Sequence, residues 1–446
     1  MLTKAQPVRM SSSENRLVRA LGVKGATMMG LGSIVGTGVF VSIGIAAGVA
    51  GPAVILAILL ACGVATCNAF SSAQLAATHP VSGGTYEYGY KYLNAPLGFT
   101  AGWMFLCAKS ASAATAALGF AGYLIQATEL GNGLLVPIAA GTVLVLTAVV
   151  LSGIRRSNWT NIAIVSITLL GLGYFVFGGL PTLATEGTTN LVPFFESPDD
   201  PEAGPLRSVL HASALMFVAF TGYGRIATMG EEVKDPKRVI PRAIVLTLIV
   251  VSLLYIGVSV VAIGAVGAAE LGESARADAA PLEVAMQALN LPAGGAIISL
   301  AAMTAMLGVL LNLILGLSRV LLAMGRRGDM PEVTTRLNLQ RTTPTIATIV
   351  VGAGVLGLAL IGDVRTTWSF SAFTVLLYYS LTNLSALQLK PEDRLYHPAF
   401  AWGGLAACLF LAFWVDMHIW LAGLGLVAIG LLWHVVAQRL AARRSA

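Results

Sequence analysis

Charged residues are scarce in this 446-residue chain, where Asp, Glu, Lys and Arg together make up 11% of the sequence. A soluble protein carries about 25%, so a chain with so few charges cannot cover a surface that faces water. The mean hydropathy of +0.80 points in the same direction. These values exclude a disordered chain, a disulfide-rich secreted domain and an ordinary cytosolic enzyme. They leave a polytopic α-helical membrane protein.

Cysteine and histidine are also rare. The four cysteines lie in apolar stretches without a CxxC pair, and the five histidines lie at or near the ends of predicted segments. Neither the HExxH pattern nor the Gly-x-Ser-x-Gly pattern occurs. We therefore expect no metal site, no cofactor and no enzymatic activity. The net charge of +6 does not indicate nucleic acid, because the cytosolic loops of membrane proteins are rich in Lys and Arg.

Apolar stretches of about 20 residues, the length that crosses a bilayer, occur twelve times. The residues before them are polar and basic, so we expect no cleaved signal peptide. The predicted spans are 25–46, 51–75, 97–126, 133–152, 159–180, 206–230, 240–268, 292–324, 343–361, 366–388, 398–415 and 418–438.

The distribution of Lys and Arg predicts the orientation. With both termini in the cytosol, 22 of the 27 cations lie on the cytosolic side. Only Arg207, Arg276 and Arg365 lie outside, and two cations lie within the membrane. Cytosolic loops carry the excess of positive charge, so the distribution predicts this topology. We expect the membrane to be a plasma (inner) membrane. The predicted organisation is a cytosolic tail 1–24, a core 25–388 with halves 25–180 and 206–388, two further spans in 398–438, and a cytosolic tail 439–446.

The 49 glycines are not evenly spread. Residues 30–40 read GLGSIVGTGVF, in the middle of the first span. The spacing does not fit a dinucleotide-binding GxGxxG motif, because Val35 or Thr37 takes the third glycine position. Two readings remain. One is close helix packing through Gly32 and Gly36, and the other is a helix broken in mid-membrane, since glycine disfavours a helix interior.

The sixth span favours the broken helix. Residues 217–226 read FVAFTGYGRI, so Gly222 and Gly224 repeat the Gly-x-Gly of Gly36 and Gly38. The two pairs lie five spans apart, which places them in opposite orientations. Interrupted segments at corresponding positions of two halves point to the binding site of a transporter.

Four motifs resemble the amino acid–polyamine–organocation (APC) superfamily of amino acid permeases. They are the first-span stretch, PVSGGTYEY at 80–88, EEVKDPKRVIPRAI at 231–244 and SRVLLAMGR at 318–326. The resemblance extends over nearly the whole chain. It implies an all-α fold of twelve spans, built as a five-plus-five inverted repeat with two appended helices. It also implies secondary active transport of amino acids by alternating access.

The resemblance also implies where the substrate binds. The carboxylate meets backbone N–H groups of the first span, where a half-helix N-terminus favours an anion. The ammonium group meets backbone carbonyls of the sixth span, with Phe220 and Tyr223 flanking the side chain or packing against neighbouring helices. The implied substrate-binding residues are Ser33, Gly36, Thr37, Gly38, Phe220, Thr221, Gly222 and Tyr223.

The sequence departs from the family in the fifth span. Many members carry a lysine there that substitutes for the sodium ion of sodium-coupled relatives, whereas this chain has Thr168, or Ser166, at that place. Two intramembrane cations occur elsewhere. Lys109 lies near the middle of the third span, and Arg225 follows the break in the sixth. Ionisable groups at such depth are costly and are functional candidates by default, so Lys109, Arg225 and Thr168 are the coupling or gating candidates.

The predicted membrane interior contains no Asp or Glu. We therefore expect neutral amino acids as substrates, since nothing offsets the extra charge of a cationic one. An exchanger, an acidic amino acid permease and an amino acid sensor on a transporter scaffold remain as alternatives. The sequence does not distinguish proton from sodium coupling, and it identifies no protein partner.

Overall fold

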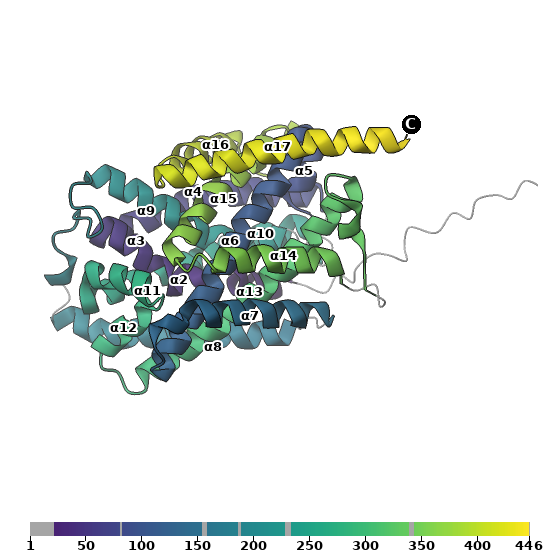
Figure 1. The fold of residues 1–446 in the computed structure, drawn as a ribbon. Coiled ribbons are helices and arrows are strands. Elements are labelled where there is room, and N and C mark those ends of the chain that lie inside the picture. The colour runs from purple at the N-terminus through teal and green to yellow at the C-terminus, as the bar shows by residue number, and fades with distance from the viewer. Residues whose placement is uncertain are drawn as a thin grey trace, which may run out of the picture.

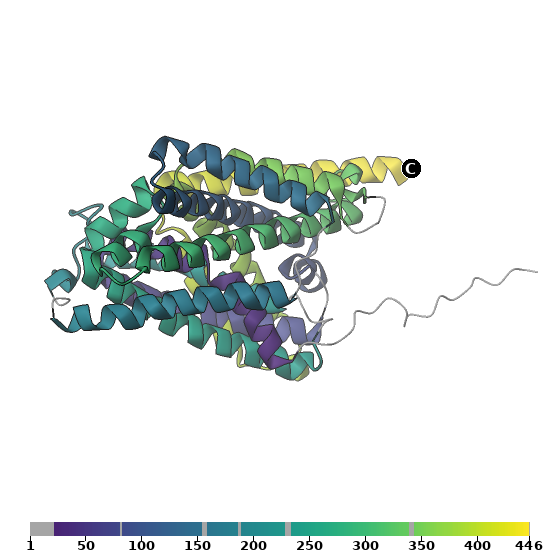
Figure 2. The ribbon, with the colours of Figure 1, turned by 90° about the horizontal axis from the view of Figure 1, so that it is seen from below.

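The computed structural model describes residues 22–80, 83–153, 158–185, 189–227, 233–338 and 343–445. The regular secondary structure of this part of the chain is helical, and an isolated bridge joins Leu337 and Pro344. The long helices run side by side in a single bundle (Figures 1 and 2). Most of the predicted N-terminal tail lies outside the described residues.

Eight stretches of the described chain are long and apolar enough to cross a bilayer, and three shorter apolar helices accompany them. This confirms a polytopic α-helical membrane protein. One stretch, Thr37–Thr78, runs through the boundary predicted between the first two spans. The long helices are α4 (Val54–Thr78), α6 (Ala95–Thr128), α8 (Asn158–Thr185), α9 (Pro205–Phe220), α11 (Pro236–Ala277), α13 (Gly294–Arg327), α15 (Val364–Leu387) and α17 (Met417–Ser445). The shorter apolar ones are α7 (Leu135–Leu151), α14 (Thr345–Ala359) and α16 (Pro398–Ala412).

The side-chain exposure fits a bilayer. Leu170 and Phe177 on α8 and Leu432 on α17 are each about 70% exposed, as lipid-facing residues are. In contrast, every residue of α3 (Ser42–Ala50) is buried. Apolar side chains therefore cover the outside of the bundle while the first segment lies in its centre. Helix α17 continues to Ser445, so the helix includes the predicted C-terminal tail.

The first segment is broken, as predicted. Helix α1 (Val23–Ile34) ends where Val35 takes an extended conformation, and Gly36 is not helical either. One short turn, α2 (Thr37–Phe40), follows, and Val41 then separates it from α3. The chain thus leaves helical geometry twice within seven residues, next to Gly36 and Gly38.

The sixth segment narrows instead of unwinding. Helix α9 passes into a 3₁₀ turn, η4 (Thr221–Tyr223), and then into the short helix α10 (Gly224–Ala227). Thr221 and Gly224 keep right-handed helical backbone angles. The expected break at Gly222 is therefore a change of helix type within the described part of this segment. The motif at 231–244 begins in residues 228–232, which lie outside the described chain.

The two ends of the bundle differ in their short helices. Helix α5 (Thr85–Tyr92) lies at one end, near the C-terminal end of α17, and α12 (Pro281–Ala288) lies at the other (Figure 1). At the α12 end, the Asp199 carboxylate pairs with Arg365 at 2.6 Å and with Arg276 at 3.2 Å. Two of the three cations that were expected outside thus meet at a single carboxylate.

Candidate functional site

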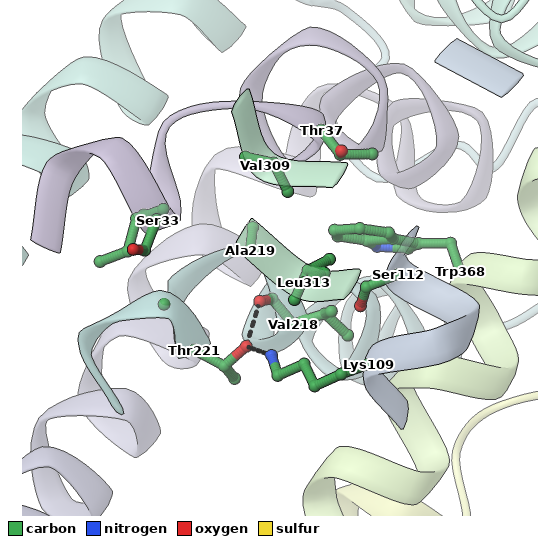
Figure 3. Close-up of a pocket in the computed structure, with 13 residues that line it drawn as sticks. Ser33, Thr37, Lys109, Ser112, Val218, Ala219, Thr221, Val309, Leu313 and Trp368 are labelled. Atoms are coloured by element: carbon green, nitrogen blue, oxygen red, sulfur yellow. Dashed lines mark hydrogen bonds between the residues drawn. The ribbon is translucent and has the colours of Figure 1, made fainter. Parts of the chain in front are cut away.

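A small pocket lies where the first and sixth segments meet, and we call it the central pocket. The central pocket has a volume of about 40 Å³. Helices α6, α13 and α15 complete its walls. It is lined by Ser33, Ile34, Thr37, Gly38, Lys109, Ser112, Val218, Ala219, Thr221, Gly222, Val309, Leu313 and Trp368 (Figure 3).

The break in the first segment supplies unused backbone donors. The N–H groups of Val39 and Phe40 bond to the Gly36 carbonyl, at 3.0 and 3.1 Å. The N–H groups of Thr37 and Gly38, at the start of the new turn, have no helical acceptor. The hydroxyl of Thr37 is buried and has no hydrogen-bond partner. This edge of the pocket therefore offers donors suited to an anionic group.

Close approach of the two segments depends on Gly222. A Cβ atom added there would collide with the Ser33 carbonyl oxygen and lie 2.5 Å from Ile34 Cγ1. Gly38 is similarly placed, since its Cβ would lie 3.0 Å from the Ala219 Cα. The glycines that suggested a broken helix thus also bring the backbones of the two segments into contact.

Tyr255 of α11 holds the two segments together. Its hydroxyl lies 3.2 Å from the Ile34 carbonyl at the end of α1, and 3.0 Å from the Ala219 carbonyl near the end of α9. A break leaves carbonyls without helical partners, which is costly in a membrane unless another group bonds to them. Tyr255 meets this need on both sides of the pocket at once.

Lys109 enters the pocket from α6. Its Nζ donates to Thr221 Oγ1 at 2.7 Å, and that hydroxyl donates to the Val218 carbonyl at 2.7 Å (Figure 3). The Thr221 carbonyl accepts a hydrogen bond from Tyr379 at 3.1 Å. Among the residues that line the central pocket, Lys109 is the one charged group. The described lining contains no carboxylate, so the pocket carries a net positive charge when Lys109 is protonated.

An apolar wall faces these polar groups. Val309 and Leu313 project from α13, and Trp368 comes from α15, where its Nε1 donates to the Leu215 carbonyl at 3.0 Å. Ser112 Oγ lies 2.7 Å from Ser371 Oγ and is thereby held against α15. No pattern in the sequence distinguishes these residues, because they look like ordinary core residues of their spans.

A wider cavity of about 220 Å³ adjoins the central pocket and shares Lys109, Thr221 and Leu313 with it. Arg225, Arg319, Tyr378 and Tyr379 also line this wide cavity. It continues into an opening of about 630 Å³, which we call the mouth. The mouth is lined by Gly83, Glu87, Arg319, Val320, Leu322, Ala323, Arg326, Arg327, Leu337 and Pro344. The central pocket is therefore connected to the α5 end of the bundle.

The α12 end of the bundle is tightly packed. Besides its two ion pairs, Asp199 donates its N–H to the Gly48 carbonyl at 2.9 Å. The Tyr123 hydroxyl donates to the Phe40 carbonyl at 2.8 Å and accepts the Leu282 N–H at 3.2 Å. Side chains and loops thus seal the pocket on the side opposite the mouth.

The predicted site residues fall into three groups. Ser33, Thr37, Gly38, Thr221 and Gly222 line the central pocket, as does Lys109. Arg225 lines the wide cavity. The remaining four lie off these linings. Gly36 packs against Val309. Phe220 is buried against Tyr255, and Tyr223 is buried against Tyr379. The Thr168 hydroxyl donates to the Ile164 carbonyl within its own helix.

Comparison with known proteins decides the family. The family model described as amino acid permease matches residues 25–441. The chain belongs to the amino acid permease family. It is therefore a membrane transporter and not an enzyme.

Individual relatives match over most of their length. An uncharacterised transporter of Mycobacterium tuberculosis is 37% identical, covering 99% of this chain and 96% of the relative. The methylthioribose transporter of Bacillus subtilis is 27% identical, over 98% of this chain and 98% of the relative. The cationic amino acid transporter 4 of Mus musculus is 29% identical, over 95% of this chain and 68% of the relative.

Proposed function

We propose that this chain is a secondary active transporter of neutral amino acids that works by alternating access. The observation that carries the proposal is the central pocket. It lies between the broken first segment and the 3₁₀ turn of the sixth, and Lys109 is the one charged residue among its described lining. The substrates named for two of the relatives differ, since one is methylthioribose and the other is a cationic amino acid. The chemistry of the site supports a neutral amino acid.

The two sides of the pocket suit the two ends of an amino acid. The carboxylate meets the free N–H groups of Thr37 and Gly38, with Ser33 and Gly36 shaping this edge. The ammonium group meets carbonyl oxygens of residues 220–223 across the pocket. The buried, unpartnered hydroxyl of Thr37 supports this mode, because buried polar groups without partners are rare unless a ligand uses them.

Charge and shape set the preference for neutral substrates. A second positive charge in the substrate would face Lys109 without a carboxylate to offset it, and burying an unpaired charge is very costly. Val309, Leu313 and Trp368 favour an apolar substrate side chain. An acidic amino acid permease and an exchanger are alternatives within the same class. A sensor on this scaffold would bind the ligand without transporting it.

Membership of the family supports the architecture that we propose. The chain forms twelve spans, with a five-plus-five inverted repeat in 25–388 and two appended helices in 398–438. Both termini lie in the cytosol, at a plasma (inner) membrane. The ion pairs of Asp199 with Arg276 and Arg365 support this orientation, because they bring two of the three predicted outer cations together at the α12 end. The mouth then opens to the cytosol, so the structure corresponds to an inward-open state.

Lys109 is the candidate for coupling to protons. It takes the role that a fifth-span lysine has in many members, since Thr168 occupies that position here. Its Nζ bonds to a residue of the turn that binds the substrate, so its protonation state and substrate binding are linked. Lys109→Ala should abolish the pH dependence of uptake, and full retention of that dependence would remove this role.

Uptake into proteoliposomes tests the proposed function. A panel of labelled neutral, acidic and cationic amino acids is offered with and without a proton gradient, sodium or internal amino acid. We expect saturable uptake of neutral amino acids that a proton gradient stimulates. Uptake that requires internal amino acid would identify an exchanger. Binding without uptake under every condition would identify a sensor and overturn the proposal.

A further inference from the structure

A buried carboxylate lies beside the mouth, outside the substrate site. Asp329 lies two residues beyond the end of α13 and is 4% exposed. Its Oδ2 accepts hydrogen bonds from the hydroxyls of Tyr86 and Tyr90, both at 2.7 Å, and its Oδ1 lies 2.8 Å from the Tyr90 hydroxyl. From α17, His434 Nδ1 lies 3.3 Å from Oδ1, and Trp433 Nε1 donates to the Asp329 carbonyl at 2.8 Å.

This cluster joins three elements that are far apart in the sequence. Tyr86 and Tyr90 belong to α5, and Asp329 follows the end of α13. His434 belongs to α17, one of the two appended helices. Burying a carboxylate is costly unless it is fully hydrogen-bonded, so Asp329 is stable only when the three elements keep their present spacing. The carboxylate thus fixes their relative positions.

The tyrosines are permanent donors to this carboxylate. Burial raises the pKa of both Tyr86 and Tyr90, and the neighbouring Asp329 carboxylate raises it further. Both hydroxyls therefore keep their protons throughout the physiological pH range.

The same helices form the walls of the mouth. Glu87 of α5 and Arg327 of α13 line it and form an ion pair at 2.5 Å. The Arg327 guanidinium also lies over the Tyr90 ring, 4.1 Å from its centre. A movement of α5 away from α13 would break these contacts together with those of Asp329, so the cluster and the width of the mouth change as one unit.

We infer that Asp329 is a positioning residue that fastens α5 and the appended helix α17 to the end of α13 and thereby limits the width of the cytosolic mouth. This role rests on the proposed transport cycle but not on the identity of the substrate. It gives the appended helices a function in the inward-open state.

His434 connects α17 to this cluster. Its Nδ1 lies 3.3 Å from Asp329 Oδ1, its ring stacks on Phe99, and its Nε2 lies 3.0 Å from the Gln438 side-chain amide. These contacts hold the ring against the carboxylate, so the position of α17 is tied to that of Asp329.

The test is the accessibility of a cysteine placed in the mouth. Val320 lines both the mouth and the wide cavity, so Val320→Cys is introduced after Cys62, Cys67, Cys107 and Cys408 are replaced. Its reaction with a membrane-impermeant maleimide is timed from the cytosolic side in proteoliposomes. Asp329→Asn should speed labelling about tenfold, a typical coupling between distant sites, because α5 is then free to move away from α13. Tyr90→Phe should speed labelling less, and it is the variant to use if Asp329→Asn does not fold.

Glu392→Gln is the matched control, because it removes a carboxylate from an exposed ion pair with Lys390, away from the cluster. It should leave the labelling rate unchanged. Parental labelling rates in folded Asp329→Asn and Tyr90→Phe would overturn the positioning role. Labelling needs no substrate, so absence of uptake in the parent would contradict the proposed function alone.

Discussion

The first and sixth segments carry the same Gly-x-Gly signature but use it differently. In the first, the backbone leaves helical geometry at Val35 and Gly36 and again at Val41. In the sixth, the chain only tightens into a 3₁₀ turn at 221–223. The difference follows from their neighbours. Gly222 is required because the Ser33 carbonyl lies against it, whereas Gly36 and Gly38 border a real interruption. A repeated glycine pattern can therefore mark either a break or the surface that a break packs against.

The contact at Gly222 should be the most sensitive point. Gly222→Ala places a methyl group against the Ser33 carbonyl and forces the two segments apart, so we expect uptake to fall about 100-fold. Initial rates of uptake into proteoliposomes measure this. Gly224→Ala is the control two residues away, since its nearest neighbour is the Tyr379 hydroxyl at 3.1 Å. Equal losses of uptake in the two variants would show that any added side chain in this turn impairs transport, and would contradict a specific role for the contact between Gly222 and the Ser33 carbonyl.

Lys109 should have the next largest effect. Lys109→Met removes the charge beside Thr221, and we expect the apparent affinity for neutral amino acids to fall about tenfold, as for the loss of a charged hydrogen bond. Arginine should begin to compete, because the repulsion is gone. Competition assays on the variant and on Lys390→Met, an exposed lysine, provide the comparison. Continued exclusion of arginine by Lys109→Met would contradict the charge argument.

Tyr255 should matter because it bonds to both segments. Tyr255→Phe keeps the ring and removes the hydroxyl from the Ile34 and Ala219 carbonyls. We expect the maximal rate of uptake to fall about fivefold with a smaller change in KM, since the segments lose a shared anchor. Tyr174→Phe removes a comparable bond, to the Pro292 carbonyl at an exposed position, and should have no effect. A change confined to KM would place Tyr255 in substrate binding instead.

A pair of threonines should show the smallest effect. Thr37→Val removes a buried hydroxyl that has no hydrogen-bond partner among the described residues, and we expect substrate affinity to fall about threefold if the substrate uses it. Thr168→Val removes a hydroxyl that bonds within its own helix and should leave affinity unchanged. Binding of a labelled neutral amino acid to the two purified variants measures the contrast. Unchanged affinity in Thr37→Val would show that the substrate does not use this hydroxyl.

The sequence predicted the class of fold because hydropathy and span length report directly on burial in lipid. It predicted the first break and the depth of Lys109, since glycine clusters and lone cations are anomalies within an apolar run. It did not predict Trp368 or Tyr255 at the site, because an aromatic residue in a span looks the same whether it packs or lines a pocket. The 3₁₀ geometry at Thr221 depends on the packing of Gly222 against Ser33, which no local pattern encodes.

The most direct test of the central claim is binding of labelled leucine to the purified protein, with leucine, alanine, glutamate and arginine as competitors. The site between the first and sixth segments presents Lys109 and no carboxylate among its described lining residues. Leucine and alanine should therefore displace the label, whereas arginine at the same concentration should not. Gly222→Ala should abolish binding. Strong displacement by arginine, or normal leucine binding by Gly222→Ala, would contradict the account.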